Sequence, residues 1–107
     1  MRILLVDDHA VVRAGFKTLL ENQGDLSVIA EAESGEAACR QFIEHAPDVV
    51  IMDLSMPGVG GIEAIRRIVS RQSDARVLVF GMHEDTLFVE QALQAGARGY
   101  IDDVIQP

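Results

Sequence analysis

Short runs of hydrophobic residues alternate along the chain with longer stretches in which hydrophobic residues recur every three or four positions. Short continuous runs are typical of β-strands that are buried on both faces of a sheet. The run at 49–52 is the most apolar, whereas the one at 26–30 has the character of a peripheral strand. In all, the pattern predicts strands at 3–6, 26–30, 49–52, 77–80 and 98–101.

In the stretches between these strands, the hydrophobic residues have the spacing of amphipathic helices. Residues that typically start or stop helices mark the ends of these stretches. Gly24 and Gly96 are typical stops, and Ser34 is a typical residue to open a helix. That helix runs to about His45, because Pro47 forbids its extension. The third helix ends at about residue 71, and the fourth is expected at about 85–95. The inward-facing positions are expected to be Val12, Phe16, Leu19 and Leu20, then Ala38 and Phe42, then Ile62, Ile65, Ile68 and Val69, and finally Phe88, Ala92 and Leu93.

The repeated β-α order predicts an α/β fold with an open parallel sheet and helices on both of its faces. The connections are too short for anything other than crossover helices. A length of 107 residues corresponds to a single domain. No apolar run approaches the roughly 18 residues that a membrane span requires.

Charge and composition narrow the possible functions. Nine Lys and Arg residues against 17 Asp and Glu residues give a formal charge of −8, and only Arg66 and Arg67 are adjacent cations. Nucleic-acid binding needs clustered cations, so this chain is not expected to contact DNA or RNA phosphates. Trp is absent and Tyr occurs once, which leaves no aromatic platform for bases. The single Cys39 cannot form an internal disulfide and is expected to pack within a helix.

Three acidic residues follow two of the predicted strands directly. Asp7 and Asp8 follow the strand at 3–6, and Asp53 follows the strand at 49–52. Ligands of open parallel sheets bind beyond the carboxyl ends of the strands, so adjacent strands would bring these carboxylates together. Such a cluster is costly unless a cation or a proton compensates, and oxygen ligands with no His or Cys partner suit Mg²⁺. In the alternative interpretation, Asp8 caps the first helix and the other two acids are solvated.

The sequence does not indicate a nucleotide, flavin, zinc or Ser-His-Asp site on the predicted parallel sheet. A dinucleotide or flavin site needs a glycine-rich turn after the first strand, and residues 7–10 contain no glycine. His9, His45 and His83 are too scattered along the chain for a zinc site, and no Ser-His-Asp arrangement is suggested.

Three motifs resemble the receiver domain of two-component response regulators: ILLVDDH at 3–9, VIMDLSMP at 50–57 and GARGY at 96–100. The segments at 58–63 and 82–85 are similar to the subfamily that usually carries a LuxR-type helix-turn-helix output domain. The resemblance extends over essentially all 107 residues.

The resemblance implies a flavodoxin-like, doubly wound sheet with strand order 2-1-3-4-5. It implies that Asp53 accepts a phosphoryl group from a sensor histidine kinase. Asp7 and Asp8 match the acids that hold Mg²⁺ together with Asp53, with the backbone carbonyl of Ser55 as a further ligand. Tyr100 matches the aromatic switch residue of the fifth strand; alternatively, it is simply a half-buried aromatic residue on an edge strand.

Two positions depart from the family pattern. Gly81 stands where the family has Thr or Ser, whose hydroxyl bonds the phosphoryl group, and Asp103 stands where it has Lys. These departures favour an alternative function, a pseudo-receiver that acts as a phosphorylation-independent interaction module. A Mg²⁺-dependent phosphatase is a third possibility, but no general acid–base residue stands out near Asp53, so the chain is not expected to be an enzyme.

The resemblance also carries expectations for the whole protein. Receiver domains usually end in a fifth helix, and the chain stops at Pro107, where that helix would begin, so residues 1–107 are expected to be a truncated receiver domain. DNA binding and control of transcription would belong to an output domain that follows, in a cytoplasmic protein. Without the fifth helix, apolar surface of the first and fifth strands is expected to be open, which makes a homodimer possible.

Overall fold

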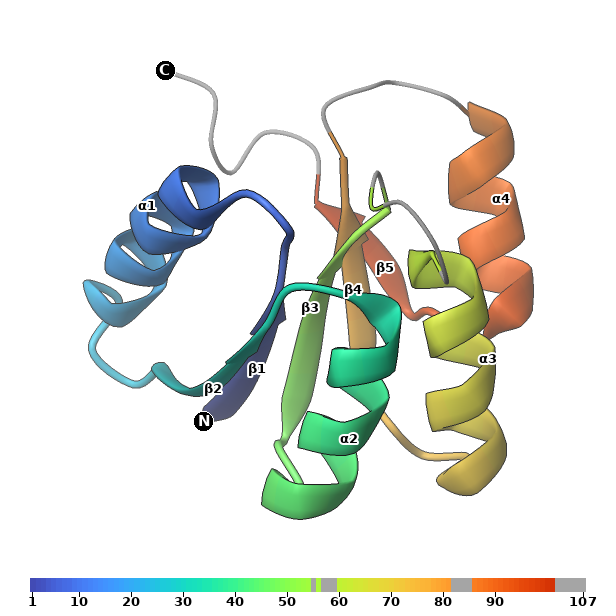
Figure 1. Ribbon diagram of the computed structural model, residues 1–107, viewed down its shortest axis with the longest axis horizontal. Helices are drawn as coiled ribbons and strands as arrows, with labels where there is room; N and C mark the ends of the chain where they lie inside the picture. Colours follow the sequence, from blue (N-terminus) through green and yellow to red (C-terminus); the bar gives the residue numbers. More distant parts are fainter. Residues whose placement is uncertain (55, 57–59, 82–85, 102–107) are drawn as a thin grey trace.

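The computed structural model describes residues 1–54, 56, 60–81 and 86–101. Within these residues the chain forms a five-stranded parallel sheet with the order β2-β1-β3-β4-β5, as expected from the resemblance. Figure 1 shows α1 on one face of the sheet and α2 and α3 on the other. The elements in chain order are β1 (Arg2–Val6), α1 (Ala10–Glu21), β2 (Ser27–Ala32), α2 (Gly35–His45), β3 (Val49–Asp53), α3 (Gly61–Arg71), β4 (Val77–Phe80), α4 (Thr86–Ala95) and β5 (Gly99–Ile101).

Alternation along the strands divides the core into two layers, one on each face of the sheet. Leu4 and Val6 of β1 pack with residues of α2, α3 and α4, whereas Ile3 and Leu5 pack with Phe16 of α1. All residues of β3 are buried, as expected for the most apolar run. Burial also confirms the predicted core positions Phe16, Leu20, Ala38, Phe42, Ile65, Ile68 and Ala92.

Helices begin and end at the capping and terminating residues that the sequence indicates. The Ser34 side chain accepts a hydrogen bond from the backbone N–H of Ala37 (3.1 Å) and so caps α2. This helix ends at His45, and its C-cap residue Ala46 has a positive φ of 45° and precedes Pro47. After α4, Gly96 has a φ of 124°, a conformation that side chains rarely adopt.

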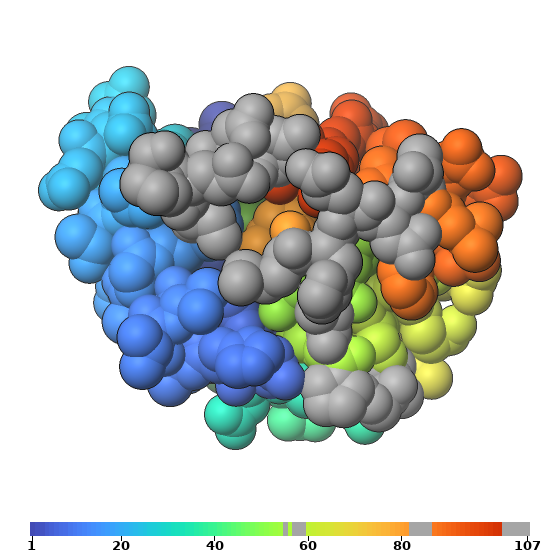
Figure 2. All heavy atoms as spheres, turned by 90° about the horizontal axis from the view of Figure 1, so that it is seen from above, coloured from blue at the N-terminus to red at the C-terminus, as the bar shows by residue number. Residues whose placement is uncertain are grey.

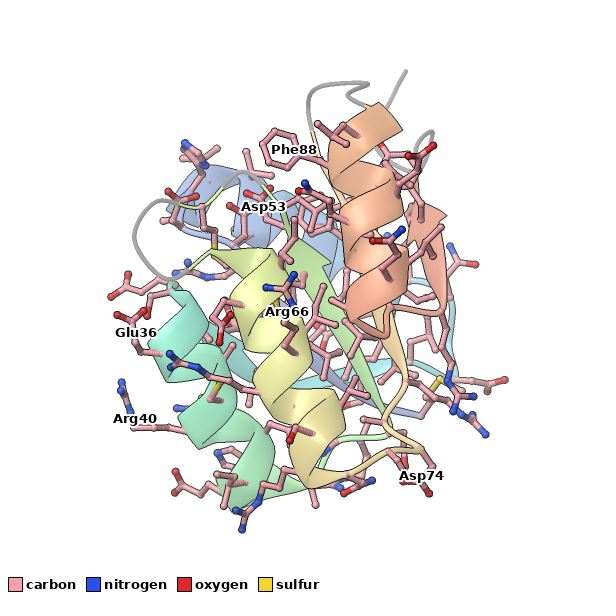
Figure 3. All side chains as sticks on the ribbon, turned by 90° about the vertical axis from the view of Figure 1, so that its right-hand side faces the viewer. Glu36, Arg40, Asp53, Arg66, Asp74 and Phe88 are labelled. Atoms are coloured by element: carbon pink, nitrogen blue, oxygen red, sulfur yellow. The ribbon has the colours of Figure 1, made fainter. Side chains whose placement is uncertain are left out.

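Several predicted core positions are wrong. Phe88 and Leu93 are about half exposed (49% and 46%), because α4 instead buries Ala92, with the half-buried Val89 and Ala95 on the same stripe. Figure 3 shows the Phe88 ring projecting from the start of α4. Leu19 is 43% exposed because Phe16 and Leu20, one turn apart, already occupy the packing face of α1. The remaining expected positions Val12, Ile62 and Val69 are half-buried.

Two expectations about the strands also differ from the structure. Strand β2 extends to Ala32 rather than ending at Ala30, because its ladder with β1 continues until Ala32 lies opposite Val6. The surface of β1 is not open: Ile3 and Leu5 are buried beneath α1. Among the described residues, no helix combines the length and the apolar character of a membrane span.

Candidate functional site: an acidic cluster at the carboxyl edge of the sheet

The pairing of β1 with β3 brings two carboxylates to the same edge of the sheet. Val6 lies opposite Met52, so Asp7 follows β1 at the level where Asp53 ends β3. Both side chains are buried, with 1% of Asp7 and 3% of Asp53 exposed. Figure 2 views this end of the molecule, where the start of α1 lies beside the end of β3. The interpretation of these two acids as solvated loop residues is therefore wrong.

The backbone around Asp7 is held by specific hydrogen bonds. Its N–H donates to the carbonyl of Ala32 on β2 (3.0 Å), and its carbonyl accepts from Nη1 of Arg13 (2.6 Å). Arg13 is itself held by Glu31, whose Oε1 accepts from Nε at 2.8 Å. These contacts fix the direction in which the Asp7 side chain leaves the strand.

One oxygen of the Asp7 carboxylate is satisfied and the other is not. Oδ1 accepts the backbone N–H of His9 at 2.8 Å. Oδ2 is buried and has no hydrogen-bond partner among the described residues, and the same holds for Oδ1 of Asp8. A buried polar oxygen without a partner is costly, so these two oxygens are suited to accept a further interaction, such as one with a cation.

Asp8 and His9 complete the cluster at its solvent side. Asp8 is 24% exposed and does not cap α1; His9 is the N-cap residue, and its side chain makes no capping hydrogen bond. Asp7, Asp8, His9 and Asp53 each place one potential ligand atom within 4.8 Å of the others. The described residues of this site thus combine three carboxylates with one imidazole.

The carboxyl end of β3 is packed tightly against the start of α3. A Cβ atom on Gly61 would lie 2.9 Å from the backbone oxygen of Asp53 and 3.3 Å from the side chains of Met52 and Leu54. Only a residue without a side chain lets α3 begin this close to the strand end. On the other side, the N–H of Leu54 donates to the carbonyl of Phe80 (2.9 Å), which ties β3 to β4 just beyond the acid.

The donor set fits a hard divalent cation. An octahedral ion with ligands at about 2.1 Å separates neighbouring ligands by roughly 3 Å and opposite ligands by roughly 4.2 Å. The four candidate ligand atoms lie within 4.8 Å of one another, and two carboxylate oxygens of the cluster lack hydrogen-bond partners among the described residues. Carboxylate oxygens are the ligands that Mg²⁺ prefers in proteins.

Of the expected switch residues, Gly81 lies at the end of the strand next to β3, Tyr100 lies on β5 two strands from β3, and Asp103 lies outside the described residues. Gly81 follows β4 directly and is half-buried, one position beyond the residue that pairs with Asp53. Tyr100 pairs with Val79 on β5 and is half-buried against the core. Ser55, His83 and Asp103 lie outside the described residues.

The sequence reasoning missed two contributors to the site. His9 was set aside because the histidines are scattered along the chain, yet its imidazole lies at the cluster. Its position directly after the acidic pair was the signal available in the sequence. Arg13 carried no such signal, because its hydrogen bond to the Asp7 carbonyl depends on the orientation of α1 relative to β1.

Cys39 lies away from the cluster, on α2. It is half-buried against the core, as expected for a packing residue. Burial raises the pKa of the Cys39 thiol, although the nearby Arg67 partly opposes this effect. The thiol is thus less reactive than an exposed cysteine.

Comparisons with known proteins agree with the fold. The family described as "Response regulator receiver domain" matches residues 3–106. Response regulator UvrY of Escherichia coli (strain K12) is 40% identical over 107 residues, which are 100% of this chain and 49% of UvrY. The chain therefore spans about half the length of this curated relative.

Solved structures show the same relationship. A LuxR-family two-component response regulator from Aurantimonas sp. SI85-9A1 has a TM-score of 0.91 and 46% identity, covering 95% of this chain and 73% of that one. A chain of the Borrelia burgdorferi complex of CheX and CheY with BeF₃ and Mg²⁺ has a TM-score of 0.89 and 26% identity, covering 95% and 77%. With the acidic cluster at the carboxyl ends of β1 and β3, these matches show that the chain belongs to the response regulator receiver domain family.

Proposed function

We propose that this chain is the phosphoryl-accepting receiver domain of a two-component response regulator, with Asp53 as the acceptor. The observation that carries the proposal is the burial of Asp7 and Asp53 side by side at the ends of neighbouring strands. Buried like charges are unfavourable unless a cation compensates for them. The arrangement therefore supports a site built to hold a cation beside a charged acceptor.

The proposed reaction is transfer from a phosphohistidine of a sensor histidine kinase. A carboxylate oxygen of Asp53 attacks phosphorus and the phosphorus–nitrogen bond breaks. The electron pair of that bond goes to the imidazole nitrogen, so that Asp53 becomes an aspartyl phosphate. Asp7 and Asp8 would hold Mg²⁺ together with Asp53 and the backbone carbonyl of Ser55. When bound, Mg²⁺ supplies positive charge opposite the acids and the phosphoryl oxygens.

The proposal extends to the protein that carries this domain. The likeness to UvrY and to a LuxR-family regulator supports a role as the input of a regulator that controls transcription. DNA contact would belong to an output domain and not to this acidic chain, whose net charge is −8. We place the regulator in the cytoplasm with its kinase, and we propose that the domain accepts phosphoryl groups and is not itself an enzyme.

Gly81 supports a second candidate function, a pseudo-receiver that works through protein contacts without phosphorylation. Because Gly81 follows β4 beside the strand end of Asp53 and has no hydroxyl, it cannot donate a hydrogen bond from a side chain to a phosphoryl group. Tyr100 as a switch residue would then lack the contact that distinguishes the two states. Asp103 in place of Lys points in the same direction.

Exposure to acetyl phosphate and Mg²⁺ separates the two candidates. We expect intact-mass spectrometry to show the gain of one phosphoryl group, because the Asp53 carboxylate lies close to those of Asp7 and Asp8. Chelation of the metal with EDTA should prevent this gain. A chain that never gains the mass, although it is folded and binds Mg²⁺, would favour the pseudo-receiver.

Mg²⁺ should raise the thermal stability of the chain, and Asp7→Asn should remove this effect. Two unit charges about 5 Å apart repel by roughly 3 kcal/mol at an effective dielectric of about 20. In EDTA, Asp7→Asn should therefore be more stable than the wild type by about 1–3 kcal/mol. The Asn side chain keeps an oxygen to accept the backbone N–H of His9. Thermal unfolding in EDTA and in Mg²⁺ measures both effects.

Asp74→Asn is the matched control for charge, because Asp74 is exposed at the opposite end of the sheet (Figure 3). It should leave the Mg²⁺ effect unchanged. A wild-type chain whose melting temperature does not respond to millimolar Mg²⁺ would argue against a metal site at the cluster.

A further inference from the structure

Arg13 links three segments of the chain beside the acidic cluster. From the first turn of α1, its Nη1 donates to the backbone carbonyl of Asp7 at 2.6 Å, and its Nε donates to Oε1 of Glu31 on β2 at 2.8 Å. The Arg13 side chain is only 18% exposed. The phosphoryl-transfer chemistry proposed above gives its guanidinium no role.

The carbonyl that Arg13 holds belongs to the peptide unit that joins the two acids of the cluster. A peptide unit is planar, and the plane that contains the oxygen of Asp7 also contains the Cα atoms of Asp7 and Asp8. Both side chains leave the backbone from these Cα atoms. A hydrogen bond that fixes this oxygen therefore also fixes the directions of the two carboxylates relative to each other.

Glu31 keeps the guanidinium in place. The Arg13–Glu31 contact is a charge-assisted hydrogen bond, and Glu31 lies opposite Leu5 in the ladder of β2 with β1. The guanidinium is planar, so the partner of Nε also determines where Nη1 points. A Lys side chain has no such rigid fork. The sheet itself thus sets the direction of the hydrogen bond to Asp7.

We infer that Arg13 is a positioning residue of the acidic cluster. Through the peptide between Asp7 and Asp8 it sets the directions of the two carboxylates, and so the affinity of the site for Mg²⁺. The inference rests on the metal site of the proposed function and adds a residue that holds the ligands without touching the ion. Contacts that orient metal ligands typically change metal affinity by about 10–100-fold.

Charge and positioning predict opposite effects for the loss of Arg13. Removing a cation beside three carboxylates makes the site more negative, which by itself strengthens the attraction for Mg²⁺. Losing the orientation of the ligands weakens Mg²⁺ binding. A contact that only joined α1 to β2 would change the free energy of unfolding and leave the affinity of the folded chain unchanged. The direction of the change in affinity therefore identifies the role.

Titration of the nitrogen-15-labelled chain with Mg²⁺, followed by the NMR signals of its backbone amides, measures affinity in folded molecules alone. Arg13→Gln should weaken Mg²⁺ binding by about tenfold. In EDTA, this variant should also shift the amide signals of Asp8 and His9. Lys17→Gln is the matched control, because Lys17 lies on the same helix and its Nζ is 3.7 Å from Oε2 of Glu31. It should change Mg²⁺ affinity by less than about twofold.

Arg13→Lys provides a second variant that keeps the charge and loses the fork. It should weaken Mg²⁺ binding by about threefold, and it replaces Arg13→Gln in the test if that variant does not fold. Wild-type or tighter Mg²⁺ binding by the folded variant would overturn the inference and leave the metal site of the proposed function standing. If the wild-type chain itself shows no Mg²⁺-dependent shifts, both are wrong.

Discussion

Asp53→Asn should take up no phosphoryl group from acetyl phosphate and Mg²⁺ under conditions in which the wild-type chain takes up one. The substitution keeps the size of the side chain at the end of β3 but replaces the nucleophilic carboxylate oxygen by an amide. Because Asp53 is buried against Asp7, losing one of two neighbouring charges should leave the fold at least as stable in the absence of metal. Intact-mass spectrometry over a time course measures the uptake.

Asp74→Asn provides the matched comparison, because it removes one carboxylate at the far end of the sheet. It should be phosphorylated at the rate of the wild type. Phosphoryl uptake by Asp53→Asn at the wild-type rate would place the acceptor elsewhere in the chain.

Gly96→Ala should destabilise the domain by about 2–4 kcal/mol, the largest stability effect that we expect from adding one methyl group. Gly96 has a φ of 124°, which strains any residue with a side chain. In addition, a Cβ atom there would lie 2.8 Å from Cγ2 and 3.0 Å from Cγ1 of Val69 on α3. Both effects act at the turn that joins α4 to β5, and urea unfolding measures their sum.

Gly15→Ala is the control for this substitution. Gly15 lies within α1, and a Cβ atom there would meet no heavy atom within 4 Å. Because Ala is the better helix former, this variant should be more stable than the wild type by about 0.5–1 kcal/mol. Equal effects of the two substitutions would mean that the conformation of Gly96 and its contact with Val69 have no influence on stability.

The fold was predictable because each strand is a short apolar run and because residues that start or stop helices lie near the helix ends. Pro47 and Gly96 end helices for local reasons of backbone geometry, so the boundaries near them are right. The exposure of Phe88 was not predictable. Which side of α4 faces the sheet depends on the fit of Ala92 against its neighbours, and hydrophobicity alone favours the larger residues.

The site was predictable only in part. The acids at two strand ends follow from the alternation of strands and helices, but their adjacency depends on strand order, which came from the family resemblance. The contact of the His9 side chain with the acids was only hinted at in the sequence, by its position directly after Asp8. Its imidazole joins the cluster because the chain turns into α1 directly after Asp8, a local geometry that hydrophobic patterning does not specify.

The most direct measurement of the central claim is identification of the residue that carries the phosphoryl group. Borohydride reduces an aspartyl phosphate to homoserine, and peptide mass mapping then locates the reduced residue in the chain. We predict homoserine at position 53 and at no other acidic position, because among the described residues Asp53 alone ends a central strand beside the Asp7–Asp8 pair. Homoserine at Asp7 or Asp8, or a phosphoryl group retained on His9, would contradict the account.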